Sequence, residues 1–284
     1  MILIAKRNLK IFFRDKSAVF FSLLAVLIII GLYVLFLGDM FVKEMSQIKN
    51  ARFLMDSWIM AGLLGITSIT TTMGAFGIMV EDKSKKISKD FYTAPIRKST
   101  LAGGYIISTF IIGVIMSIIT LMLAEIYIVS SGGKFLPLIA LLKVLGLILI
   151  SVISSSSMVF FAVSFFKSQK GFASACTVIG TMIGFLTGIY IPIGSLPGAV
   201  QFVVKIFPVS HAAALFRQVF MEYPLSQAFI GAPVEQINKF KETFGVIFKF
   251  GDYIISPAAS IAVLILTTAI FYGLAIINLS RKKK

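Results

Sequence analysis

Six long apolar runs restrict the fold of this 284-residue chain more than any other feature. Each run meets the requirement of about 20 residues for a helix that crosses the hydrocarbon core of a membrane. Because lipid offers no partner to a free backbone N–H or C=O group, helices are the economical structure for such runs. Only 14% of residues are charged, against about 25% in average soluble proteins. The sequence predicts an all-α integral membrane protein with six spans, at 18–38, 56–80, 101–129, 136–166, 171–192 and 255–279.

Lys and Arg residues gather in the segments on one side of this predicted membrane domain. Seventeen lie in the N-terminal segment, after the second run, after the fourth run and in the tail, whereas nine lie in the longer segments of the other side. Cytoplasmic segments of membrane proteins carry an excess of such residues. We therefore expect both termini to be cytoplasmic, in the plasma (inner) membrane of a prokaryote. Topology then accounts for the net charge of +15, and no nucleic-acid partner is expected.

The whole chain, 1–284, is predicted to form a single domain. Two of its segments are neither spans nor simple loops. Segment 2–16 has the pattern of a helix that lies in the membrane interface, although an ordinary basic flank of the first span is the alternative. Its apolar face and its basic face are formed by Ile2, Ala5, Leu9 and Phe12 and by Lys6, Lys10 and Arg14, respectively.

Segment 192–220 is apolar but is interrupted by Pro192, Pro197 and Pro208. One straight helix cannot pass through three prolines, so we expect a re-entrant hairpin on the outer side. Segment 221–254 is then an extracellular loop.

The usual chemistry of a membrane enzyme or ion-driven carrier is missing from the sequence. His211 is the only histidine, Cys176 is the only cysteine, and there is no GxxxxGK[ST] phosphate loop. Glu125 and Lys143 lie near the outer ends of their runs, where a structural or snorkelling role is favoured over ion coupling. We therefore expect no catalytic residue, no metal site and no cofactor bound by this chain. If the protein pumps a substrate, a partner must supply the energy.

Small and hydroxyl-bearing residues mark two of the runs. Thr67, Thr71 and Thr72 fall together on the second run and, with Thr181 on the fifth, are candidates for a substrate pathway, with helix packing as an equal alternative for the Thr-rich face. Gly180, Gly184 and Gly188 form two GxxxG steps that permit close helix approach, either within one chain or in a dimer.

The charged segment EDKSKKISKDFYTAPIRKST, at 81–100, also contains apolar residues. A loop whose only role is to set the topology would not need them. Ser84 or Ser88 is suited to begin a short helix, and Pro95 disfavours helix at the residue before it. Ile87 and Phe91 share one face of such a helix, with Tyr92 beside them. Aromatic residues among charges are typical of protein interfaces. Docking of a partner is therefore favoured over a solvated loop.

The order of these parts resembles that of the ABC type-2 permeases, the membrane subunits of ATP-binding cassette exporters. The resemblance rests on RNLKIFFRDKSAVFF at the start, EDKSKKISKDFYTAPIRKSTLAGG in the middle, and PIGSLPGAVQFVVKIFPVSHAAALFR before the last span. Two departures are Lys86-Ile87, where the family often has Gly-Thr, and a longer outer loop. The resemblance implies that the coupling segment, 81–98, docks on a separate ATPase through Ile87, Asp90, Phe91, Tyr92 and Pro95.

The resemblance also implies a function. The chain would be a permease that exports an apolar or amphipathic substrate such as a drug, peptide or lipid. It would act with a second copy or a paralogue and with ATPase subunits that hold ATP and Mg²⁺. Two other classes stay open: a carrier or channel that works without ATP, and an accessory, sensor or immunity protein that docks partners without transport.

Overall fold

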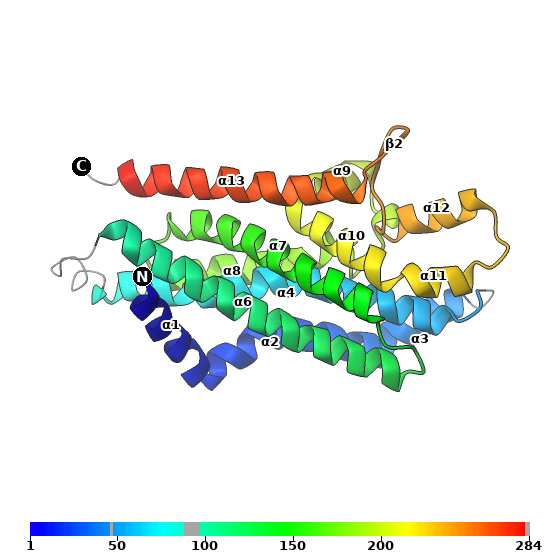
Figure 1. Cartoon of the computed structure of the whole chain (residues 1–284), viewed down its shortest axis with the longest axis horizontal. Coiled ribbons are helices and arrows are strands. Elements are labelled where there is room, and N and C mark those ends of the chain that lie inside the picture. The colour runs from blue at the N-terminus through cyan, green and yellow to red at the C-terminus, as the bar shows by residue number, and fades with distance from the viewer. Residues whose placement is uncertain (46–47, 88–96, 282–284) are drawn as a thin grey trace.

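The computed structural model describes residues 1–45, 48–87 and 97–281. Within these ranges the protein is almost entirely helical, as expected (Figure 1). Its elements are α1 (Ile2–Arg14), α2 (Lys16–Leu32), the π-helix η1 (Tyr33–Leu37), α3 (Gly38–Glu44), α4 (Ala51–Ser84), α6 (Lys98–Ser130), α7 (Leu138–Val163), α8 (Gln169–Leu186), the 3₁₀-helix η2 (Ile193–Ser195), α9 (Gly198–Ile206), α10 (Pro208–Phe220), α11 (Glu222–Ala228), α12 (Val234–Thr243), the hairpin strands β1 (Lys249–Phe250) and β2 (Tyr253–Ile254), and α13 (Pro257–Arg281).

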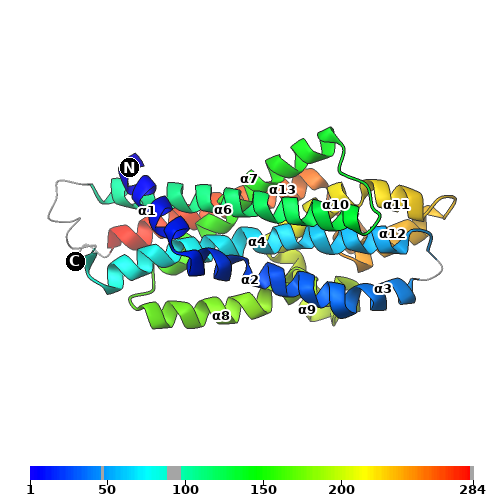
Figure 2. The same ribbon diagram turned by 90° about the horizontal axis from the view of Figure 1, so that it is seen from below.

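Helix α4 is the centre of the bundle. In its most apolar window 83% of the residues are buried, against 22% for α13. It packs against α2, α6, α7, α8 and α10, and Figure 2 shows it running between α6 and α8. A side chain at Gly65 would lie 3.0 Å from the Cβ atom of Ala213 on α10. The absence of that side chain lets the two helices approach closely.

In the described part of the chain, five helical segments are long and apolar enough to cross a membrane: Val26–Lys43, Ala51–Ser84, Ser99–Ser130, Leu138–Val163 and Pro257–Asn278. The count reaches six only if the bent pair α9–α10 is one span. The expected fifth span, 171–192, is not among them, because α8 begins with the polar Gln169 and Lys170 and ends at Leu186, before the last apolar residues of the run. Gly188 there adopts a positive φ of 67°, and the N–H groups of Gly188 and Ile189 bond to Phe185 and Gly184. This is a Schellman turn, which stops the helix.

The proline-rich segment breaks where expected. Pro192 and Pro197 precede η2 and α9, and Pro208 is the first residue of α10. Helices α9 and α10 meet at an angle of 84°. A proline has no N–H to donate and is tolerated at the start of a helix, so each of these residues marks the place where a new element begins. The re-entrant position of this pair in a membrane stays a prediction.

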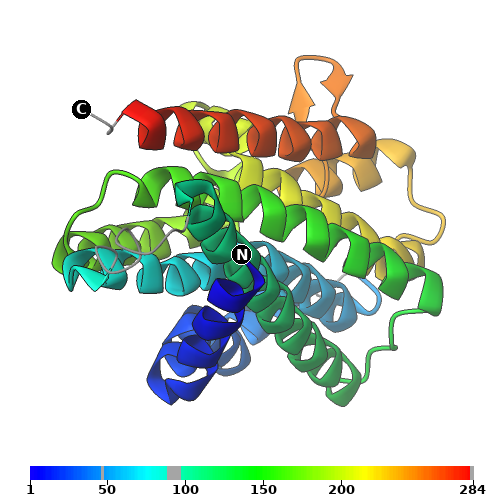
Figure 3. The ribbon, with the colours of Figure 1, turned by 60° about the vertical axis from the view of Figure 1, so that its left-hand side comes forward.

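Different elements of the chain lie at the two ends of the bundle. The N-terminus, the end of α4, the start of α6 and the end of α13 lie together at one end, which we call the inner end (Figure 1). Helices α11 and α12 and the β1–β2 hairpin lie at the opposite, outer end (Figure 1). The expected loop 221–254 is therefore built of short elements. At the inner end α1 packs across the first turns of α6 (Figure 3).

Candidate functional site

A buried cluster at the inner end joins three helices. The guanidinium of Arg7 on α1 donates two hydrogen bonds to the carboxylate of Asp82 on α4, at 2.6 and 2.8 Å. The hydroxyl of Tyr105 on α6 donates a third to the same carboxylate. Beside them, Asn8 accepts from Arg7 at 3.0 Å and donates to Ser108 at 3.2 Å. We call these five residues the Asp82 cluster.

Burial makes the Asp82 carboxylate dependent on its neighbours. The side chain of Asp82 is only 4% exposed, so its charge depends on Arg7 and Tyr105 for solvation. The hydrogen bond to Asp82 raises the pKa of Arg7 above its usual value. Two parallel bonds also fix the orientation of a guanidinium more firmly than a single contact does. The relative position of α1, α4 and α6 is therefore tied to one carboxylate.

Helix α1 covers the expected segment, but its buried face is only partly the expected one, and its place in a membrane interface stays a prediction. Its buried residues are Ile4, Ala5, Asn8 and Phe12, whereas Ile2 is 79% exposed. Gly104 on α6 explains the shift, because a side chain there would lie 2.6 Å from the Cγ2 atom of Ile4. The close approach of α6 selects which side of α1 is covered.

The coupling segment leaves and re-enters the bundle beside the Asp82 cluster. Helix α4 extends past its expected end to Ser84, whose hydroxyl donates to the carbonyl of Glu81. Ser84 therefore ends a helix and does not begin one. Lys86 follows with a positive φ of 63°, and α6 starts at Lys98. Ile87 is helical and half-buried. Asp90, Phe91, Tyr92 and Pro95 lie outside the described residues, as does Ser88.

The threonines of α4 lie inside the protein. Thr67, Thr71 and Thr72 are all fully buried. Each hydroxyl bonds to a carbonyl of its own helix, and Thr67 also lies 3.2 Å from the hydroxyl of Thr120 on α6. Thr181 is exposed on α8 and bonds to its own helix. The structure brings the first three together in the α4 packing and leaves Thr181 apart from them.

The three glycines of the fifth run have three different environments. A side chain at Gly180 would meet nothing within 4 Å. One at Gly184 would collide with the ring of Tyr190. Gly188 lies past the end of α8, in the turn described above. The second GxxxG step is therefore not a continuous helical face. A role of Gly180 in packing against another chain stays a prediction.

A second polar network, at the outer end, was missed by sequence reasoning. Asp56 on α4 is 1% exposed; it accepts a hydrogen bond from Tyr33 at 2.8 Å and lies 3.4 Å from the Nε atom of Arg52. Arg52 also donates to Asp39 at 2.8 Å. The predicted span 56–80 puts Asp56 at its edge, where a charged residue is ordinary. Because α4 begins at Ala51, Asp56 lies inside the helix instead.

Arg217 on α10 was expected only as part of a motif. It is fully buried, and its Cζ atom lies 4.9 Å from the ring centre of Trp58. Its Nη2 atom has a long contact of 3.4 Å with the carbonyl of Gly188. Its Nε and Nη1 atoms have no hydrogen-bond partner among the described residues. No carboxylate in the described part of the chain pairs with this guanidinium. The cation–π contact with Trp58 is therefore the interaction that partly offsets the burial of its charge.

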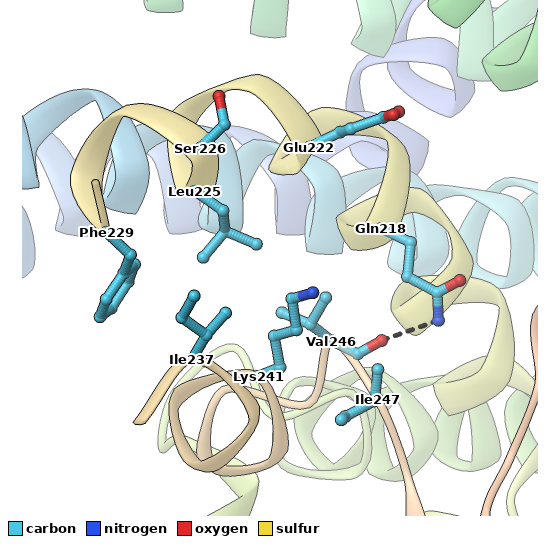
Figure 4. A pocket seen from close by; sticks show the side chains of 9 residues that line it. All are labelled: Gln218, Glu222, Leu225, Ser226, Phe229, Ile237, Lys241, Val246 and Ile247. Carbon is cyan, nitrogen blue, oxygen red and sulfur yellow. Dashed lines mark hydrogen bonds between the residues drawn. The ribbon is translucent and has the colours of Figure 1, made fainter. Parts of the chain in front are cut away.

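A small pocket of about 340 Å³ opens beside α11 at the outer end. Figure 4 shows the side chains of Leu225, Ile237 and Val246 facing one another across it. Gln218 closes one side with a hydrogen bond of 2.8 Å to the carbonyl of Val246. Within the described ranges, no group of three His, Cys, Asp or Glu side chains is placed to hold a metal ion.

Comparison with known proteins places these features in a family. A family model described as "ABC-2 family transporter protein" matches residues 43–277. That range includes α4, the coupling segment and the bent pair α9–α10. None of the curated proteins compared with the sequence matches it. The match covers the second and third of the motifs that carry the resemblance, whereas the first, residues 7–21, lies before it. The family is confirmed: the chain belongs to the ABC-2 family of transporter proteins and is a multi-pass membrane permease.

Proposed function

We propose that this chain is the membrane subunit of an ATP-driven exporter and receives energy at the inner end. A separate ATP-binding cassette subunit docks on the coupling segment, and its closure moves α4 and α6 through the Asp82 cluster. The observation that supports this proposal is the three-helix junction on one buried carboxylate, next to a segment rich in charges and aromatic residues. ATP and Mg²⁺ are held by the partner.

The packing of α4 supplies a route from this junction to the rest of the molecule. Asp82 lies in the last turn of α4, and the same helix contacts α10 through Gly65 and reaches Asp56 at the outer end. Packed cores tend to move between discrete arrangements rather than to deform continuously. A displacement of the inner end of α4 is therefore transmitted along its length.

The arrangement also supports the proposed topology. The N-terminus and the end of α13 lie at the inner end (Figure 1), where the sequence carries most of its Lys and Arg. We place this end in the cytoplasm and the protein in the plasma membrane of a prokaryote. Helix α1 then lies at the interface, where its exposed face carries Ile2 and Leu3 beside Lys6 and Lys10 and meets the headgroup region. A second copy or a paralogue completes the permease.

An ATP-independent carrier is less favoured. Such a carrier typically has intramembrane carboxylates that relay an ion. Among the described residues, Asp56 and Glu125 lie near the outer end and Asp82 near the inner end, with α4 carrying no acidic residue between Asp56 and Glu81. An apolar or amphipathic substrate fits such a middle region, whose fully buried Thr67, Thr71 and Thr72 become accessible only if α6 and α7 move away from α4.

Docking is tested by substitution of Phe91. The Phe91→Asp protein is expected to insert into the membrane but to lose the ATP-binding cassette subunit that co-purifies with the unchanged protein. Tyr253→Asp is the matched control, because Tyr253 is 66% exposed in the outer hairpin, and it should leave co-purification unchanged. Equal recovery of the ATPase with both variants, or its absence from gently purified unchanged protein, would contradict the proposal.

A further inference from the structure

A groove of about 630 Å³ lies at the outer end, on the other side of α11 from the small pocket. The two cavities share Glu222 and Ser226. The walls of this outer groove are mostly apolar and aromatic. They include Phe53, Ile128, Leu136, Ile139, Phe220 and Tyr223. A cavity of this size and lining is typical of sites for small organic molecules.

One acidic side chain in the groove has an unused hydrogen-bonding atom. Glu125 on α6 is 3% exposed, and its Oε2 atom accepts a hydrogen bond of 3.0 Å from the backbone N–H of Leu136. Its Oε1 atom is buried and has no hydrogen-bond partner among the described residues. A buried acceptor without a donor is costly and is rare in native proteins. A donor from a bound molecule would remove this cost.

The basic residues of the groove are engaged elsewhere. Lys134 donates a hydrogen bond of 2.9 Å to the hydroxyl of Tyr223. Lys143 lies 4.0 Å from Glu222. Within the described part of the chain, Glu125 forms no ion pair with either lysine. The groove therefore offers one buried acceptor without a donor and two lysines that contact other residues, Lys134 a neutral hydroxyl and Lys143 a carboxylate.

The exposed start of α7 continues the apolar surface of the groove. Leu138 and Ile139 are each 71% exposed, and Leu142 is 59% exposed. Ile139 is also part of the groove wall. An apolar chain that leaves the groove past Ile139 meets further apolar side chains and not water. The site is thus open on the side where a membrane would supply amphiphiles.

We propose that the outer groove binds amphiphiles that carry a protonated primary amine. The ammonium group donates a hydrogen bond to Oε1 of Glu125, and the apolar tail lies against Ile139 and the exposed start of α7. A carboxylate or sulfate head would be repelled by the same oxygen. A neutral hydroxyl head would form only an uncharged hydrogen bond, which is worth less than a charge-assisted one. Binding requires this chain alone, so it does not depend on ATPase docking.

The test is equilibrium binding to the purified chain in lipid nanodiscs, with empty nanodiscs subtracted. The probes are radiolabelled dodecylamine, dodecanol and dodecanoate, which share one tail and differ in the head group. At neutral pH the unchanged protein should bind dodecylamine at least about tenfold more tightly than dodecanol, and dodecanoate more weakly still, as expected for a charge-assisted hydrogen bond. Equal affinity for amine and alcohol would overturn the proposal.

Two variants assign the preference to Glu125. Glu125→Gln keeps the size of the side chain and an acceptor for Leu136, and it should bring the affinities for amine and alcohol to within about twofold. Glu235→Gln removes an exposed carboxylate of α12 that lies outside the groove lining, and it should retain the amine preference. A preference that persists in Glu125→Gln would overturn the assignment. If that variant does not fold, the comparison of amine with alcohol on the unchanged protein still decides whether the groove selects a cation.

Discussion

Each end of the bundle holds a buried aspartate that is paired, Asp82 at the inner end and Asp56 at the outer end. The outer end, however, also holds buried charged groups with atoms that have no partner among the described residues. At the inner end, Asp82 is matched by both Arg7 and Tyr105. At the outer end, Oε1 of Glu125 and two nitrogens of Arg217 lack partners among the described residues. A fully satisfied cluster holds its helices in one arrangement, whereas unmatched groups favour a second arrangement or a ligand that satisfies them. The difference indicates a rigid joint for receiving force and an adaptable region for contact with substrate.

The largest effect is expected from removal of the central carboxylate. Asp82→Ala leaves Arg7 and Tyr105 without their acceptor and should lower the free energy of unfolding by about 3 kcal/mol. Association with the ATPase should fall as well, because both ends of the coupling segment lose their anchor. Thermal unfolding in detergent and co-purification measure the two effects. A variant that matches the unchanged protein in both would show that the cluster is not the joint.

The corresponding change at the outer end separates stability from coupling. Asp56→Asn weakens the hydrogen bond from Tyr33 and the ion pair with Arg52 and should cost about 1–3 kcal/mol of unfolding free energy. Because Asp56 lies at the far end of α4, the co-purified amount of ATPase should not change. Loss of the ATPase from a folded Asp56→Asn protein would mean that the ends are not functionally distinct.

A conservative substitution sharpens the role of geometry at the inner end. Arg7→Lys keeps the positive charge but removes the two parallel hydrogen bonds to Asp82, so we expect a loss of about 1 kcal/mol. The melting temperature should lie between those of the unchanged protein and Asp82→Ala. A loss as large as that of Asp82→Ala would show that charge alone does not maintain the joint.

The smallest change in stability is expected in the middle of α4. Thr67→Val removes a hydroxyl that bonds mainly to its own helix and has a longer contact of 3.2 Å with Thr120. Because the hydroxyl of Thr120 itself bonds to Met116, the unfolding free energy should change by less than about 1 kcal/mol. If the threonine face lines the substrate pathway, export by the reconstituted complex should nevertheless fall. Leu63→Ile, a change on the same helix and without a polar group, is the control. Unchanged export in Thr67→Val would leave the threonine with a packing role only.

The fold was predictable from the sequence where a local rule decides the structure. Apolar runs identified the long helices, Pro197 marked the start of α9, and Pro208 marked the break between α9 and α10. The end of α8 was missed because a hydropathy pattern continues through Gly188, although its backbone does not. A run of apolar residues sets a minimum length for a span and does not fix its last residue.

The candidate sites were less predictable because they depend on distant partners. Arg7 and Asp82 are 75 positions apart in the sequence, and each reads alone as a charged residue at the edge of an apolar run. Asp56 and Arg52 were hidden in the same way, because α4 begins five residues before the expected start of its span. Such a charged residue becomes a buried contact between helices only when it pairs with a distant residue. That pairing depends on tertiary packing, which the hydrophobic periodicity of the sequence does not predict.

Site-specific photocrosslinking tests the central claim most directly. A photoreactive amino acid is placed at Phe91 in the coupling segment or at Tyr253 in the outer hairpin, and the complex is irradiated in its native membrane. An ATP-driven permease with an inner joint predicts a crosslink to the ATP-binding cassette subunit from position 91 and none from position 253. A crosslink from position 253, or none from position 91 in a complex that still contains the ATPase, would contradict the proposed site of energy input.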